Sequence, residues 1–171
     1  MPGLEPMLTA LPMSKRLAFA AACGERILNE VANLGEEIPG EEPVRRGIDF
    51  GWRAAGGETI DRAEAEAIYE NVRNAIPITE DSSEFEMACA GAGGIPALMA
   101  LEPDDSASHA ASVAEQMVSL VGLYYEDSRR VELEEERWQR TLIERLESAP
   151  ARVTREIVNT VPDYDRGERV E

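Results

Sequence analysis

Apolar residues recur at helical spacing along almost the whole chain. In the segment 14–34, Leu17 and Ile27 fall on one face, whereas Arg26 and Glu30 are among the charged residues expected mostly outside. No segment shows the sustained alternation that predicts a strand. The same spacing predicts helices over residues 4–11, 14–34, 43–55, 61–76, 83–101, 106–125, 131–148 and 151–159.

Several boundaries carry their own local signals. Ser14 is a candidate N-cap for the first long helix, and Gly35 is the residue expected to end it. Asp61 stands at the start of the segment 61–76, and Ser82 or Ser83 precedes the segment 83–101. We therefore expect short loops between helices rather than long irregular regions.

The segment 83–101 is the most apolar part of the chain and is rich in small residues. Gly91 and Gly93 let other backbones approach closely, which predicts a central buried helix. Pro96 removes an amide donor and crowds the preceding turn, so we expect this helix to be bent or broken near Gly94–Pro96.

The expected fold is all-α. The segment 106–125 is apolar almost all round, so it should be covered on two sides and pair with 83–101. From 131 to 148, Val131, Trp138, Leu142 and Leu146 form a narrow apolar stripe typical of an outer helix. We predict one domain of about seven helices over residues 1–162, followed by an acidic frayed tail at 163–171.

The net charge of the chain indicates which classes of partner it attracts and which it repels. The chain has 34 acidic and 17 basic residues, giving a net charge of −17. Such a surface repels nucleic-acid phosphates and anionic lipids, so neither is an expected partner. It attracts basic proteins and speeds their encounter, although an acidic surface can also serve solubility alone.

The remaining composition favours a bacterial cytoplasmic protein. Lys15 is the single lysine among the cations, which suggests a GC-rich coding sequence. Cys23 and Cys89 lie in apolar segments with helical spacing and are typical of buried thiols in a reducing compartment. We find neither a secretory signal nor a stretch suited to spanning a membrane.

Candidate chemistry is sparse. His109 is the single histidine, with Ser106 and Val113 at the positions one turn away, which does not favour a metal site. The run 90–94 resembles a phosphate-binding loop only in its glycines, because no strand precedes it and no lysine follows. We therefore expect no catalytic residue, no metal and no cofactor, with an enzyme using carboxylate-bound metal as a remaining alternative.

A dense charged run follows the apolar segment 106–125. Its carboxylates could bind Mg²⁺ or act as acid and base, but exposed helical carboxylates more often form solvated ion pairs. Tyr125 and Trp138 flank the acidic turn at 126–128. Either aromatic residue could anchor a partner, or both could simply hold the outer helix in place.

Three sequence stretches carry a resemblance to a known family. These are KRLAFAAACGERIL near the start, GIDFGW, and SVAEQMVSLVGLYYE after the small-residue segment. Together with the proline-ended third long helix and its acidic loop, they make residues 11–126 similar to the YjaG-like family of small all-helical bacterial proteins of unknown function. The resemblance implies kinship with immunity proteins encoded beside secreted bacterial toxins, and it transfers no catalytic residue.

We therefore expect a non-enzymatic immunity protein that occludes a basic toxin, such as a nuclease, through acidic side chains. The alternative is a homodimeric structural or regulatory module that buries the Trp138 face, and the chain could be a monomer or a homodimer. The expected partner-binding residues are Glu36, Glu37, Glu41, Glu42, Glu132, Glu135, Glu136 and Trp138.

Overall fold

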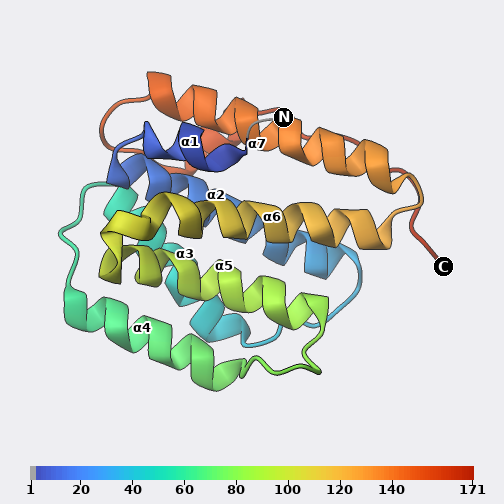
Figure 1. The fold of residues 1–171 in the computed structure, drawn as a ribbon, viewed down its shortest axis with the longest axis horizontal. Coiled ribbons are helices and arrows are strands. Elements are labelled where there is room, and N and C mark those ends of the chain that lie inside the picture. The colour runs from blue at the N-terminus through green and yellow to red at the C-terminus, as the bar shows by residue number, and fades with distance from the viewer. Residues whose placement is uncertain (1–2) are drawn as a thin grey trace.

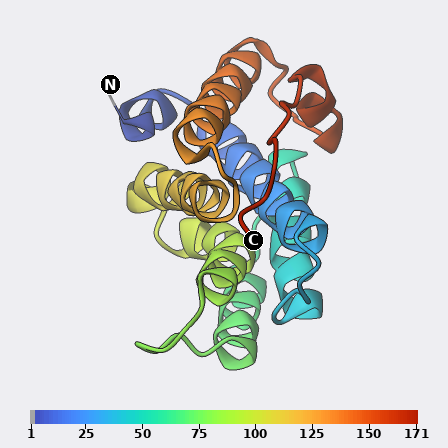
Figure 2. The same ribbon diagram turned by 90° about the vertical axis from the view of Figure 1, so that its right-hand side faces the viewer.

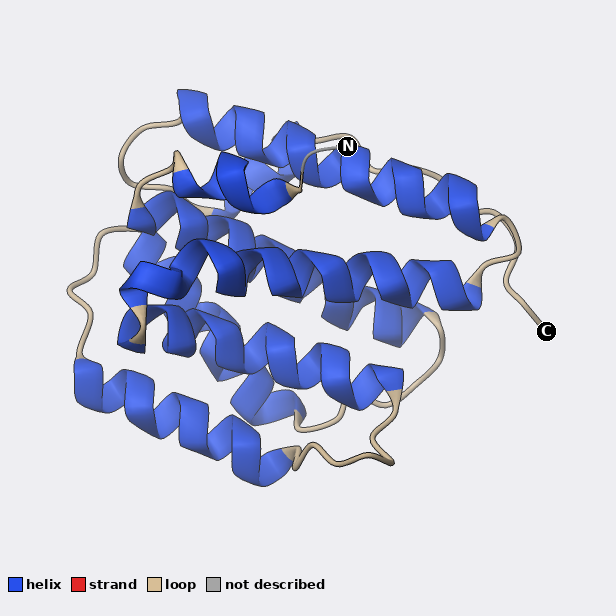
Figure 3. Ribbon diagram, in the orientation of Figure 1, coloured by secondary structure: helices blue, strands red, loops and turns tan. Residues whose placement is uncertain are grey.

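The computed structural model describes residues 3–171 and is all-helical, as the sequence predicts (Figures 1 and 3). No strand is present among these residues, and they form one compact bundle. The α-helices are α1 (Leu4–Thr9), α2 (Met13–Asn33), α3 (Glu41–Ala55), α4 (Arg62–Ala75), α5 (Glu84–Leu101), α6 (Ser106–Tyr124) and α7 (Ser128–Ser148), and the 3₁₀ helices are η1 (Pro103–Asp105) and η2 (Arg155–Thr160).

Helices α5 and α6 form the predicted central pair. Helix α5 packs against α2, α3, α4 and α6, whereas α6 packs against α1, α2, α5 and α7. In Figure 1, α7 lies along one edge of the bundle and α4 along the other. The four apolar residues predicted to form the stripe of the outer helix are all buried in α7, against the rest of the bundle.

The glycines of α3 and α5 allow these two helices to touch through their backbones. A Cβ atom added at Gly47 would overlap the carbonyl of Gly93, and one added at Gly93 would lie 2.6 Å from Cα of Val44. Close packing at Gly93 is therefore confirmed. Gly91 differs, because a Cβ there would meet nothing within 4 Å.

Helix α5 is continuous through Pro96, so the expected break is wrong. Pro96 lacks the N–H that would bond the carbonyl of Ala92 one turn back. That carbonyl faces Gly24 of α2, where an added Cβ would lie 3.2 Å from the Ala92 oxygen. That carbonyl therefore lies in the close contact between α5 and α2.

The local signals at helix ends agree in part with the structure. Ser83 caps α5 and forms a capping box with Glu86, in which each side chain bonds the other residue's backbone N–H. The Asp61 side chain accepts from the N–H of Ala63 at the start of α4. Gly35 follows α2 with a φ of +80°, but Pro12, not Ser14, is the N-cap of that helix.

The end of the chain differs from the prediction. The helix expected over 151–159 is the 3₁₀ helix η2, over Arg155–Thr160. The segment 163–171, expected as a frayed tail, returns along α2 and the α6–α7 turn. There the N–H of Glu126 donates to the carbonyl of Glu168, and the N–H of Val170 donates to that of Tyr124.

Candidate functional site

Two of the predicted partner-binding residues are buried. Glu135 is 0% exposed and Trp138 is 3% exposed, because both lie on the inward face of α7. They are therefore not part of an accessible surface in this chain. A homodimer that buries Trp138 loses its expected anchor for the same reason.

Glu132 and Glu136 lie elsewhere on α7. The Glu132 carboxylate packs beside Gly122 of α6 and lies 3.7 Å from Arg129. Glu136 lines a hollow of about 600 Å³ between α6 and α7, beside the start of α1. Because Glu135 and Trp138 are buried, the eight predicted residues do not form one exposed surface.

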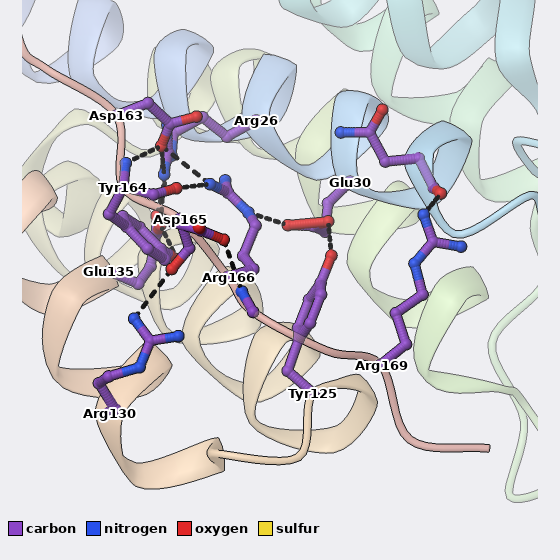
Figure 4. A network of polar contacts seen from close by, with 12 residues as sticks. Arg26, Glu30, Tyr125, Arg130, Glu135, Asp163, Tyr164, Asp165, Arg166 and Arg169 are labelled. Atoms are coloured by element: carbon purple, nitrogen blue, oxygen red, sulfur yellow. Dashed lines mark hydrogen bonds and ion pairs between the residues drawn. The ribbon is translucent and has the colours of Figure 1, made fainter.

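A buried ionic cluster holds Glu135. Arg26 of α2 makes a bidentate contact with its carboxylate, with Nε 3.0 Å and Nη2 2.5 Å from the two oxygens. The Tyr164 hydroxyl donates to the same carboxylate at 2.9 Å. The guanidinium of Arg26 also lies over the ring of Trp138, at 3.8 Å from its centroid. Figure 4 shows this cluster between α2, α7 and the C-terminal segment.

A second part of the cluster is built on Glu30, whose side chain is fully buried. Arg166 donates from Nε to Glu30 at 2.6 Å, and the Tyr125 hydroxyl donates to the other carboxylate oxygen at 2.6 Å (Figure 4). Asp163 joins the two parts, because it accepts from Arg26 at 3.2 Å and from Arg166 at 3.0 Å. We call Arg26, Glu30, Tyr125, Glu135, Asp163, Tyr164 and Arg166 the ionic clamp.

The protonation states of the ionic clamp suit a structural role. Burial tends to lower the pKa of Arg26, but the hydrogen bond and charge of Glu135 outweigh it and raise that pKa. Burial, together with Glu135, raises the pKa of the Tyr164 hydroxyl, and burial with Glu30 raises that of Tyr125 to about 12. Both hydroxyls keep their protons at neutral pH and act as donors, so neither tyrosine is an activated base.

Sequence reasoning missed the ionic clamp because it placed the charges of α2 outside. A signal was present: Phe19, Cys23, Arg26 and Glu30 recur at helical spacing and form a stripe that is apolar at its start. Lys15 is likewise buried, and its amine donates to the carbonyl of Ala149 after α7 at 2.8 Å.

A different set of carboxylates meets at one end of the bundle. The loop before α3 and the loop before α5 lie at the same end as the α6–α7 turn and the C-terminus, on the right in Figure 1 and facing the viewer in Figure 2. The two loops are in contact, because a Cβ added at Gly40 would lie 2.9 Å from Cγ1 of Ile76. We call Glu36, Glu37, Glu41, Glu42, Glu80 and Asp81 the acidic end.

An aromatic pair at this end of the bundle lies near acidic side chains from two elements. The rings of Phe85 and Tyr124 stack with centroids 4.8 Å apart, which joins the start of α5 to the end of α6. Burial raises the pKa of Tyr124, and the negative charges of Glu84 and Glu36 raise it further. Carboxylates from the loop before α3 and from the first residue of α5 thus act on one hydroxyl.

All six side chains of the acidic end are exposed. Glu41 and Glu42 are paired with Arg45 and Arg46 one turn along α3. Within residues 3–171, the other four carboxylates (Glu36, Glu37, Glu80 and Asp81) have no ion-pair partner. This end therefore carries uncompensated negative charge, which a basic surface could neutralise.

His109 lies beside two acidic residues, Glu102 and Asp105, that precede it in the chain. Its Nε2 lies 2.9 Å from a Glu102 oxygen, and potential ligand atoms of Glu102, Asp105 and His109 lie within 4.8 Å of one another. Both carboxylates are exposed, and the group lies at the start of α6, where the helix dipole disfavours a cation. The arrangement is compatible with a weak metal-binding site on the surface.

Within the described part of the chain, no helix combines the length and apolar composition needed to cross a bilayer. A scan against protein-family models found no match, and a search of curated proteins found none. Among solved structures, the chain is similar to a DUF416 family protein from Shewanella baltica OS155, with a TM-score of 0.65 and 16% identity over 94% of this chain and 92% of that one. At this identity, the likeness shows a shared all-helical fold.

Proposed function

We propose that this chain is a non-enzymatic binding protein that captures a basic protein partner on the acidic end. The observation that supports this most directly is the meeting of four unpaired carboxylates from two separate loops at one end of the bundle. Exposed like charges at one end of the molecule repel one another, and a cationic partner relieves that repulsion. Complementary charge also speeds association and selects against acidic competitors.

At a finer level, we propose that the partner is a secreted bacterial toxin and that the chain is its immunity protein. The resemblance to the YjaG-like family supports this, together with the net charge of −17. Nuclease toxins present basic clefts to their substrates, and the acidic end would occupy such a cleft. Neutralisation then needs no catalysis, because the bound protein excludes the substrate.

Capture from the native cell tests this proposal. Wild-type protein and a Glu36→Arg, Glu37→Arg, Glu80→Arg, Asp81→Arg variant would each be used as bait, with mass spectrometry of the bound proteins. We expect one stoichiometric basic partner with the wild-type bait and none with the variant. A partner that binds both baits equally, or is acidic, would contradict the proposal.

A control variant reverses charge at the opposite end. Glu144→Arg and Glu147→Arg change exposed carboxylates near the end of α7, away from the acidic end (Figure 1). This variant alters the net charge in the same direction, although by less. Capture should be retained if the partner binds the acidic end and lost if total charge alone decides it.

A further inference from the structure

An apolar groove runs between α4 and α5 and continues to the loop that follows α4. Its volume is about 500 Å³, within the range of protein binding pockets. Ile78 is 52% exposed at one edge of the groove and extends its apolar surface. The apolar walls are formed by Tyr69, Val72, Ile76, Ile78, Ile95 and Leu98.

The groove exists because α5 presents small residues towards α4. A Cβ added at Gly94 would lie 3.7 Å from the Tyr69 ring, in ordinary contact, and Ala90 lines the same wall. The small residues of α5 thus lie on two faces of the helix. Gly93 packs against α3, whereas Ala90 and Gly94 face α4 and leave room for the groove.

The polar groups around the groove do not suit a small-molecule ligand. Small-molecule sites fix orientation with a few converging polar groups inside the pocket. Here Glu70, Arg73 and Asn74 are all exposed at the rim, and Arg73 lies over the Tyr69 ring at 5.7 Å. As far as the described chain extends, none of the lining residues has a buried polar atom without a partner.

The acidic residues near one end of the groove favour a positively charged partner. Glu70 and Arg73 have opposite charges, but Glu80 and Asp81, two and three positions after the lining residue Ile78, have no ion pair in the described chain. A second copy of this chain would bring another net charge of −17 to this rim, so self-association is unfavourable here. An apolar surface flanked by cations is complementary instead.

We propose that this groove receives the apolar face of a basic amphipathic helix from the protein partner, with Lys or Arg side chains directed at Glu80 and Asp81. The inference rests on the proposed function, because it assigns part of the partner's surface to a site beside the acidic end. Helices commonly bind in this way, with apolar side chains one turn apart seated between two helices of the receptor.

A synthetic probe tests the groove without the native partner. The probe is a 14-residue amphipathic peptide made of leucine and lysine at helical spacing, and its control replaces each leucine with serine at unchanged charge. Binding would be followed by titration calorimetry and by amide chemical shifts of ¹⁵N-labelled protein. We expect saturable one-to-one binding with shifts concentrated on α4 and α5, and binding by the serine peptide weaker by about tenfold or more.

Variants separate the apolar and ionic contributions. Ile78→Ser removes an exposed apolar side chain from the rim, and Leu133→Ser is its control on α7, far from the groove. We expect Ile78→Ser to weaken binding of the leucine peptide about tenfold and Leu133→Ser to leave that binding unchanged. Glu80→Gln with Asp81→Gln should make binding weaker and less dependent on salt.

Equal binding of the leucine and serine peptides, or shifts spread over the acidic end without α4 and α5, would overturn the groove proposal. An Ile78→Ser variant that binds like wild type would do the same. These failures differ from failure of the proposed function, which is the absence of a basic partner in native capture. Groove binding by the probe would stand even in that case.

Discussion

At the residue scale, the glycines of α5 differ in what surrounds them. Gly93 touches the backbone of α3, where an added Cβ would lie 2.6 Å from Cα of Val44. Gly91, two positions away, has open space. Both glycines were predicted to allow close approach of another backbone, but of the two only Gly93 does so in the structure.

Substitution by alanine should reveal this difference. We expect Gly93→Ala to lower the free energy of unfolding by ~1–3 kcal/mol, because backbone atoms must move. Gly91→Ala should raise it by ~0.5–1 kcal/mol, since alanine is the better helix former. Urea unfolding of the two variants measures both values, and equal effects would contradict this account of α5.

The Tyr125 hydroxyl should make stability depend on pH in the alkaline range. Its pKa is raised to about 12 by burial and by Glu30, whereas tyrosine in an unfolded chain titrates near ~10. The folded state therefore holds a proton that the unfolded state has lost, so stability is complete below pH ~10 and falls as the pH rises towards about 12.

Tyr125→Phe removes this titration. Between pH ~10 and ~12, the free energy of unfolding of the variant should fall less steeply than that of the wild type. Tyr164 contributes a slope of the same sign in both proteins, because its pKa is also raised. Identical slopes in chemical unfolding at a series of pH values would show that the Tyr125 proton is not linked to folding.

At the scale of elements, the C-terminal segment is held by buried charge. Glu30 is fully buried, and Arg166 is the cation that compensates it. Removing one partner from a buried pair leaves an uncompensated charge, which costs far more than the loss of an exposed pair. The segment 163–171 is therefore a structural part of the bundle.

Arg166→Ala should lower the free energy of unfolding by ~3 kcal/mol, because Glu30 then keeps only the Tyr125 hydroxyl. The control is Arg129→Ala, which removes an exposed partner 3.7 Å from Glu132 and should cost ~0–1 kcal/mol. Thermal and urea unfolding measure both. Similar losses in the two variants would mean that the segment contributes no more than a surface ion pair.

The sequence predicted the helices well because their apolar stripes are local. The ionic clamp was missed because its members are far apart in the chain: Arg26 and Glu135 are separated by 109 positions. A pattern that assigns charged residues to the outside cannot show that two charges bury each other. Gly47 was also missed, since a glycine in a helix gives no sign of what its partner helix brings against it.

At the scale of the whole molecule, charge and fold act together. The acidic residues Glu36, Glu37, Glu41 and Glu42 are exposed, as the sequence predicts, but the loop expected over 36–42 ends earlier, because Glu41 and Glu42 already belong to α3. Periodicity could not predict that Glu80 and Asp81 would lie at the same end, because helical spacing does not tell which loops meet. The order of packing around α5 decides this, by placing the starts of α3 and α5 at one end of the bundle (Figure 2).

The rate of association with the captured partner tests the central claim most directly. It would be measured by stopped flow at low and high salt for the wild type and for Glu36→Gln, Glu37→Gln, Glu80→Gln, Asp81→Gln. We predict a wild-type rate that falls by about tenfold or more as salt rises, and a variant rate that is slower at low salt and nearly independent of salt. Equal rates for the two proteins at every salt concentration would contradict a binding role for the acidic end.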